Sequence, residues 1–243
     1  MIALTERDRA LVHAAWSLGL ATHETLRLLV SPQTRANTLR RRLCLLHSNG
    51  YLTQTRHVGP GRCIWLYGAG PRALTPGEPR PWRPSLAQLE HTLAVGEALV
   101  ALTRPDFAAP LTITGWQGES EVRAWARPGT PLPDARIMWH EGSRSGTWFV
   151  EVDRATESHA AWRRKLVRYL ALPRSETVLA ITTSRARAQA LAILAGEFGL
   201  DLAATTIGEA SSSADPVVYD GARRRLCNLS AWAGAALREG QPR

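Results

Sequence analysis

Lysine is almost absent from this sequence, and cysteine and long apolar runs are scarce as well. The 243 residues include 30 Lys and Arg, of which only Lys165 is a lysine. The three cysteines are an odd number without a Cys-x-x-Cys pair, which excludes a disulfide scaffold and a zinc ribbon and favours a reducing compartment. No apolar run is long enough to cross a membrane, and the N-terminus has no apolar signal core. We therefore expect a cytoplasmic protein.

Acidic residues are too few to balance the arginines, and the excess of positive charge is concentrated in the N-terminal third. The 21 Asp and Glu leave a net charge of +9. Residues 1–75 contain ten Arg and three acids, a net of +7, whereas residues 76–243 contain 20 basic and 18 acidic residues, a net of +2. A basic module joined to a nearly neutral body is typical of a polyanion-binding head. A membrane partner is disfavoured, because the module breaks into short elements instead of one anchored amphipathic helix.

The basic module has the pattern of three helices followed by a hairpin. Thr5 and Thr22 are placed to cap the first two helices, and Pro32 is expected to open the third. Residues 51–67 then form two strands around a Gly/Pro-rich turn. This order predicts a winged helix-turn-helix over residues 1–75, with the third helix in the major groove of DNA.

Polar side chains on the third helix and basic side chains on the wing are the expected contacts to double-stranded DNA. They are Arg35, Asn37, Arg40, Arg41, Arg56 and Arg62. Leu39, Leu43 and Leu46 recur at helical spacing and are expected to point inward. The aromatic residues Trp65 and Tyr67 are expected in the core. The alternative is an adaptor whose winged helix binds a protein and no DNA.

The rest of the chain is predicted to form a second domain behind a stiff linker. Residues 76–89 are rich in proline and form the linker, and residues 90–243 form the domain. Strands and helices alternate there, which predicts an α/β sandwich with a mixed sheet and makes the whole protein α+β. Residues 210–216 are expected to be flexible. A last helix from residues 223–225 onward either completes the core or mediates a homodimer.

Carboxylates gather on one predicted hairpin of this domain. Its strands cover residues 133–139 and 147–153, and alternation places Glu151 and Asp153 on one face, with Asp134 on the neighbouring strand. Such an oxygen-rich cluster suits Mg²⁺. Lys165 follows on the edge of a buried helical stripe, from which it is expected to face these acids.

Several short segments share their order and spacing with a known family. They run from about residue 4 to 190 and comprise Leu4-Thr5-Glu6-Arg7-Asp8, Arg40-Arg41-Arg42-Leu43, Asn49-Gly50-Tyr51-Leu52, His91-Thr92-Leu93-Ala94-Val95, Glu121-Val122-Arg123, Pro133-Asp134-Ala135, Glu151-Val152-Asp153-Arg154-Ala155-Thr156-Glu157 and Lys165-Leu166-Val167-Arg168-Tyr169. In these segments the chain resembles the replication-relaxation family of bacterial plasmids and mobile elements.

The resemblance implies a winged helix-turn-helix joined to a PD-(D/E)xK nuclease-like domain, which has the restriction-endonuclease-like fold. It implies a sequence-specific DNA-binding regulator of plasmid or mobile-element replication or transcription, which needs no cofactor to bind DNA. The nuclease pattern expects a lysine where Asp153 stands. Lys165 on the following helix is then the replacement.

Two interpretations of the acidic cluster follow from this departure. In a Mg²⁺-dependent endonuclease, Asp134 and Glu151 would bind the metal, and Lys165 would orient the attacking water, with Asp153 beside them as part of the catalytic group. In an inactive nuclease-like domain, the acids and the lysine instead form a buried ion-pair network. The sequence favours the inactive domain.

Overall fold

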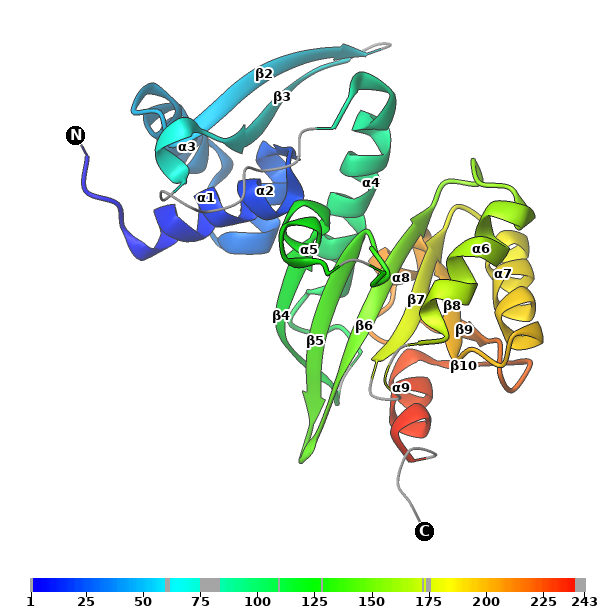
Figure 1. The fold of residues 1–243 in the computed structure, drawn as a ribbon. Helices are drawn as coiled ribbons and strands as arrows, with labels where there is room; N and C mark the ends of the chain where they lie inside the picture. The colour runs from blue at the N-terminus through cyan, green and yellow to red at the C-terminus, as the bar shows by residue number, and fades with distance from the viewer. Residues whose placement is uncertain are drawn as a thin grey trace. The chain divides into compact units, whose positions relative to one another are not determined.

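A computed structural model shows a mixed α+β protein with a three-stranded and a seven-stranded sheet (Figure 1). The structure describes residues 2–59, 62–74, 84–108, 110–127, 129–171, 173 and 176–238. The chain divides into two compact units. Unit 1 comprises Met1–Val100 and Gln117–Trp125, and unit 2 comprises Ala101–Trp116 and Ala126–Arg243.

Unit 1 is built from helices and a small antiparallel sheet. Its helices are α1 (Glu6–Leu18), α2 (His23–Val30), α3 (Ala36–Ser48), the 3-10 helix η1 (Pro71–Ala73), most of α4 (Leu86–Leu102) and α5 (Glu119–Trp125). Its strands are β1 (Ala21–Thr22), β2 (Leu52–Gly59) and β3 (Arg62–Ala69), in the order β1-β3-β2. The hairpin expected over residues 51–67 is therefore confirmed. Of the linker expected over residues 76–89, residues 76–83 lie outside the part that the structure describes.

The first two helices begin where the sequence predicts. The Thr5 side chain accepts a hydrogen bond from the Asp8 backbone, and the Asp8 carboxylate accepts from the Thr5 backbone at 2.7 Å, which completes a capping box. Thr22 caps α2, because its side chain accepts a hydrogen bond from the Thr25 backbone amide at 3.0 Å. Both caps satisfy amide groups that have no partner within the helix.

The third helix begins later than predicted, at Ala36 instead of Pro32. Ser31 is the C-cap of α2: its amide still donates to the Arg27 carbonyl at 2.8 Å, but its backbone (φ −148°, ψ 61°) leaves the helical conformation. The Pro32 carbonyl accepts a hydrogen bond from the Arg27 guanidinium at 2.6 Å, which stabilises the turn between α2 and α3. Arg35 occupies the N-cap of α3 without a capping hydrogen bond from its side chain.

Leucines of α3 contribute to the core of unit 1, as their spacing predicts. Leu39, Leu43 and Leu46 are each at most 1% exposed. Leu11 of α1 and Leu26 of α2 are equally buried. Burying a leucine side chain contributes roughly 1.5–3 kcal/mol, so this stripe fixes which face of α3 is turned toward solvent.

Unit 2 is a mixed sheet with helices against it. Its strand order is β10-β9-β8-β7-β6-β5-β4, in which β6, β7 and β8 run parallel, whereas β5–β6, β8–β9 and β9–β10 pair antiparallel. The strands are β4 (Thr112–Gly118, its last two residues in unit 1), β5 (Ala135–Glu141), β6 (Arg144–Asp153), β7 (Glu176–Thr182), β8 (Leu202–Thr206), β9 (Val217–Asp220) and β10 (Arg225–Asn228). The helices are α6 (His159–Tyr169), α7 (Arg185–Glu197), α8 (Ile207–Ser212) and α9 (Leu229–Arg238).

The helices α6 and α7 connect the parallel strands and share one core with them (Figure 1). Trp162, Leu166 and Tyr169 of α6 pack with Phe149 of β6 in this cluster, and Leu191 of α7 joins them. Parallel strands require such crossover helices, which explains why helical patterns alternate with strands in this part of the sequence.

Three parts of the fold differ from the sequence expectation. Strand β4 and helix α5 were not predicted, and α8 extends into the stretch 210–216 that was expected to be flexible. Residues 223–225 do not open a helix. The carboxylate of Asp220 accepts from the Arg223 backbone at 3.1 Å, and Arg224 takes a positive φ, so the chain turns there into β10. No helix among the described residues has the length and apolar character needed to cross a membrane.

We predict that Asp8→Asn lowers the free energy of unfolding by roughly 2–4 kcal/mol at pH 7. Asp8 is fully buried and joins α1 to α3, because its carboxylate accepts from the Arg42 guanidinium at 2.7 Å. That guanidinium holds the pKa of Asp8 well below its ordinary value. The stabilisation is therefore present at neutral pH, and it is lost as the pH falls below the ordinary aspartate pKa of about 3.9.

Urea unfolding at pH 7 and at pH 3 measures this effect. Glu24→Gln is the matched control, because it breaks a carboxylate–arginine pair in the same unit whose carboxylate is largely exposed. The control substitution is expected to lower the free energy of unfolding by at most about 0.5 kcal/mol. Equal losses in the two variants would contradict the prediction.

Candidate nucleic-acid interface and acidic cluster

The outward face of α3 is polar and basic. Asn37, Arg40, Arg41 and Cys44 recur at positions i, i+3, i+4 and i+7, and all four are exposed. This spacing places them on one face of the helix, opposite the buried leucines. Arg35, at the N-cap of α3, is exposed as well. The part of the chain that the structure describes offers no carboxylate partner to Arg35, Arg40 or Arg41.

The run of three arginines is divided between two roles. Arg42 turns away from the outward face and pairs with buried Asp8 of α1. Arg40 and Arg41 keep their guanidinium groups in solvent. The pair with Asp8 thus fixes the rotation of α3 and, with it, the direction in which the other two arginines project.

The hairpin also carries an exposed arginine, Arg56. Arg56 of β2 pairs with Trp65 of β3, so both side chains lie on one face of the sheet, and Arg56 donates to the Cys63 sulfur at 2.9 Å. Tyr67 lies on the same face, two residues along β3 from Trp65. Burial raises the pKa of Tyr67, and the nearby Arg40 guanidinium opposes this rise. Helix α3 contacts β2, the strand that carries Arg56.

Of the six side chains predicted to contact DNA, five are exposed in unit 1. They are Arg35, Asn37, Arg40, Arg41 and Arg56. The side chain of Arg62 lies outside the described residues. Trp65 was expected in the core, yet it is 41% exposed, whereas Tyr67 is 1% exposed as expected. Both rings lie on the same face of β3, but Tyr67 is further from the hairpin tip, at the position where β3 also pairs with β1.

In unit 2, Glu151 of β6 is the centre of a buried group of hydrogen bonds and ion pairs. Glu151 is 1% exposed, and its carboxylate accepts from the Lys165 ammonium at 2.8 Å and from the Tyr169 hydroxyl. Lys165 also donates to Glu157 at 3.1 Å and lies over the Trp162 ring. The only lysine of the chain therefore faces the carboxylates, as the sequence predicts.

Burial and neighbouring charge set the protonation of this group. Burial and, after it, the charge of Asp134 raise the pKa of Glu151 to about 7, although Lys165 and Tyr169 act to lower it. Burial lowers the pKa of Lys165, but the carboxylates of Glu151 and Asp134 outweigh it and keep that pKa above its ordinary value. Burial also raises the pKa of Tyr169, so its hydroxyl keeps its proton and donates.

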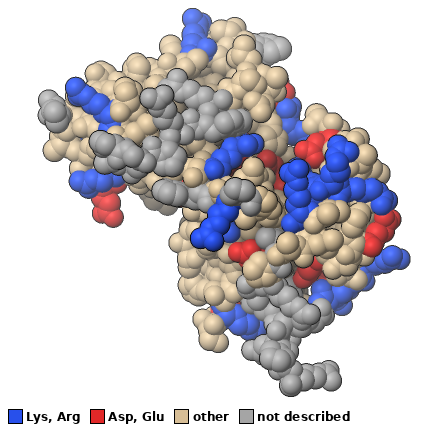
Figure 2. Space-filling model, in the orientation of Figure 1, with Lys and Arg blue, Asp and Glu red and all other residues tan. Residues whose placement is uncertain are grey.

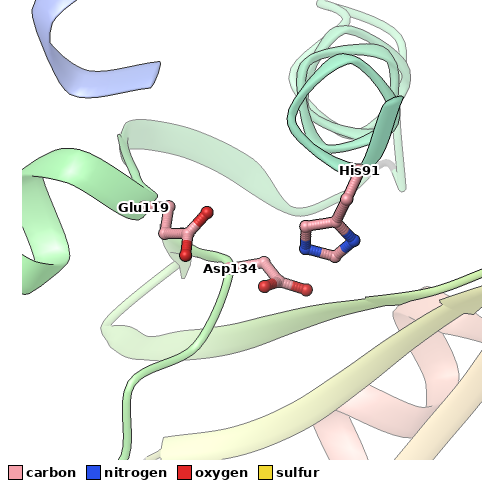
Figure 3. A group of neighbouring side chains, drawn as sticks. All are labelled: His91, Glu119 and Asp134. Atoms are coloured by element: carbon pink, nitrogen blue, oxygen red, sulfur yellow. The ribbon is translucent and has the colours of Figure 1, made fainter. Parts of the chain in front are cut away.

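The other two predicted acids have separate partners. Asp134 lies directly before β5, and its carboxylate accepts from the Val152 backbone at 2.8 Å (Figure 3). Asp153 accepts from the Arg187 guanidinium of α7 at 2.5 Å and from the Ala155 backbone at 3.1 Å. Asp153 is therefore balanced by an arginine that the sequence analysis did not assign to it.

Figure 3 also draws two side chains of unit 1, His91 of α4 and Glu119 at the start of α5. A ring nitrogen of His91 and a carboxylate oxygen of Glu119 lie within 4.8 Å of each other. Glu119 also accepts from Arg123 at 2.6 Å. The sequence analysis names His91 only within a family segment and assigns it no acidic neighbour, because helix α5, which begins with Glu119, was not predicted.

The comparisons with known proteins give one match. The family model described as replication-relaxation matches residues 17–182, which is more than half of the chain. This range contains α2, α3, the hairpin and the cluster around Glu151. No curated protein and no solved structure matches the chain.

We predict that the stability of the wild-type protein falls as the pH rises from about 4.5 to 7, and that Glu151→Gln flattens this dependence. The pKa of Glu151 is raised to about 7 in the folded state. A carboxyl group with a raised pKa stabilises the fold fully below its unfolded value and loses that contribution as the pH passes the folded value. Over this pH range, the free energy of unfolding of the wild-type protein is expected to fall by roughly 1–3 kcal/mol because of Glu151.

Urea unfolding at several pH values between 4 and 8 tests this dependence. Glu197→Gln is the control, because Glu197 is a largely exposed acid of α7 that pairs with Arg163. The control is expected to follow the wild-type curve. If the stability of Glu151→Gln also follows the wild-type curve, the titration of Glu151 is not the cause of the pH dependence.

Proposed function

This chain belongs to the replication-relaxation family, and we propose that it is a sequence-specific double-stranded DNA-binding protein. Family membership points to a role in the replication or relaxation of mobile elements. Within that role we propose a regulator of plasmid or mobile-element replication or transcription. The observation that carries the proposal is the outward face of α3, where exposed arginines have no carboxylate partner among the described residues.

The order of elements in unit 1 supports a winged helix-turn-helix. Helices α1, α2 and α3 precede the β2–β3 hairpin, and the short strand β1 joins that hairpin as a third strand. In this arrangement α3 is the recognition helix and enters the major groove. Its first turns carry Asn37 and Arg40. Asparagine pairs with adenine and arginine with guanine in that groove, so these two side chains are the proposed readers of sequence.

The remaining arginines supply affinity. Arg41 on α3 and Arg56 on the hairpin are the proposed phosphate contacts, and Arg62 is a further one expected from the sequence. Contacts to phosphates release condensed counterions, so binding weakens steeply with added salt. The protein needs no cofactor for this kind of binding.

We predict that Arg40→Ala combined with Arg41→Ala weakens binding to duplex DNA by at least about tenfold and lowers the salt slope by about one to two units. Fluorescence anisotropy over a range of salt concentrations measures both quantities. Arg7→Ala combined with Arg9→Ala is the matched control, because it removes the same charge from exposed positions of α1. Unchanged affinity and slope in the α3 variant would refute the proposal, and wild-type protein without any DNA binding would favour an adaptor role.

A Mg²⁺-dependent endonuclease is the second candidate, and the position of Lys165 favours it. Lys165 reaches the Glu151 carboxylate from α6 although no lysine follows Glu151 on its own strand. The oxygen atoms nevertheless do not suit a metal as they stand. Both oxygens of Glu151 accept hydrogen bonds, from Lys165 and Tyr169, and one oxygen of Asp134 accepts from the Val152 backbone. A cation would have to displace these donors, so we rank a non-catalytic ion-pair network first.

We therefore predict no plasmid nicking by the wild-type protein with Mg²⁺ or Mn²⁺, and a loss of roughly 2–4 kcal/mol of stability in Lys165→Ala. This variant leaves Glu151 without its cation. Lys165→Arg keeps a cation and is expected to regain most of the stability. Metal-dependent nicking that disappears in Asp134→Ala and in Lys165→Arg would instead establish the nuclease.

A further inference from the structure

Helix α6 carries a basic face that points into solvent. Its opposite side, with Trp162, Leu166 and Tyr169, is buried in the core of unit 2. Arg163, Arg164 and Arg168 are exposed, and Figure 2 shows basic side chains gathered over this helix. No acidic residue occurs anywhere in α6. Unit 2 has 17 basic and 13 acidic residues, a net charge of +4, and α6 alone contributes four cations and no acid.

The arginines of α6 are not equally engaged. Arg163 pairs with Glu197 at 2.9 Å and lies against the Phe198 ring, and Lys165 is turned inward to Glu151. Arg164 and Arg168 have no carboxylate partner among the residues that the structure describes. They are four residues apart, so their side chains leave the same side of the helix about 6 Å apart along its axis.

Intrahelical effects account for only part of this arrangement. Arg168 lies in the last turn of α6, where a cation is favoured by the helix dipole. Arg164 lies in the middle of the helix, where the dipole gives no such benefit. Two exposed cations on one face without acids between them cost a small repulsion, which a polyanionic partner would remove.

We propose that Arg164 and Arg168 form a second nucleic-acid contact, in which α6 binds phosphates of duplex DNA. The inference rests on the proposed DNA-binding function and assigns part of that function to unit 2. Guanidinium groups suit the role, because each can donate two parallel hydrogen bonds to one phosphate. Such contacts add affinity without selecting a sequence.

Charge and packing favour nucleic acid over an anionic membrane. A helix that binds in a membrane interface inserts a bulky apolar face below the headgroups. The apolar face of α6 packs in the core of unit 2, and Val167 (54% exposed) and Leu170 (48% exposed) are the large apolar side chains exposed beside the arginines. Two such side chains do not make an insertable face, so the helix offers mainly charge, which fits the closely spaced phosphates of a duplex.

The test uses the full chain with Arg164→Gln and Arg168→Gln combined, and anisotropy titrations on duplex DNA over a range of salt concentrations. We expect about tenfold weaker binding and a salt slope smaller by about two units, since each lost phosphate contact removes about 0.9. The preference for the specific site over random duplex is expected to stay unchanged. Arg224→Gln combined with Arg225→Gln is the matched control, because it removes the same charge from exposed positions at the β9–β10 turn of unit 2.

The outcomes separate this inference from the proposed function. If the wild type binds DNA, the α3 variant is impaired and the α6 variant equals the control, then the second contact is refuted while the proposed function stands. If the wild-type protein does not bind DNA, both the proposed function and the second contact on α6 are refuted. Sedimentation with phosphatidylserine vesicles completes the test, because binding to vesicles that the α6 variant loses, together with unchanged DNA affinity, would assign the face to a membrane instead.

Discussion

Three buried carboxylates among the described residues are each paired with a cation, and these pairs determine which arginines remain for a ligand. Asp8 takes Arg42, Glu151 takes Lys165, and Asp153 takes Arg187. An ionised group without a partner in the interior would cost several kcal/mol. These pairs therefore fix helices against their neighbours, and they also withdraw particular cations from solvent.

The two surfaces proposed for DNA follow directly from these pairs. In α3, the Asp8–Arg42 pair and the buried leucines hold the helix so that Arg40 and Arg41 project outward. In α6, Lys165 is held by Glu151 while Arg164 stays exposed. Each helix thus combines an inward cation that stabilises the fold with outward cations that are available to phosphates.

Local signals in the sequence predict much of the fold. Caps such as Thr5 and Ser158, the leucine stripe of α3 and the alternation around Glu151 act within a few residues, so the chain itself displays them. The failures occur where distant groups compete. Pro32 is a favourable first residue of a helix, but its carbonyl instead accepts a hydrogen bond from the Arg27 guanidinium, and the residue lies in a turn. The β9–β10 turn depends in a similar way on Asp220, which lies before the predicted helix.

The chain on its own establishes that positive charge is concentrated in the first third, that acids gather near Glu151 and that one lysine stands beside a buried stripe. Amino-acid composition and residue spacing are sufficient to recognise these three properties. Folding settles which oppositely charged groups meet, because partners such as Asp8 and Arg42 or Asp153 and Arg187 are 34 residues apart. No periodicity encodes such a pairing, since it arises only when separate elements pack and exclude water from the charges between them.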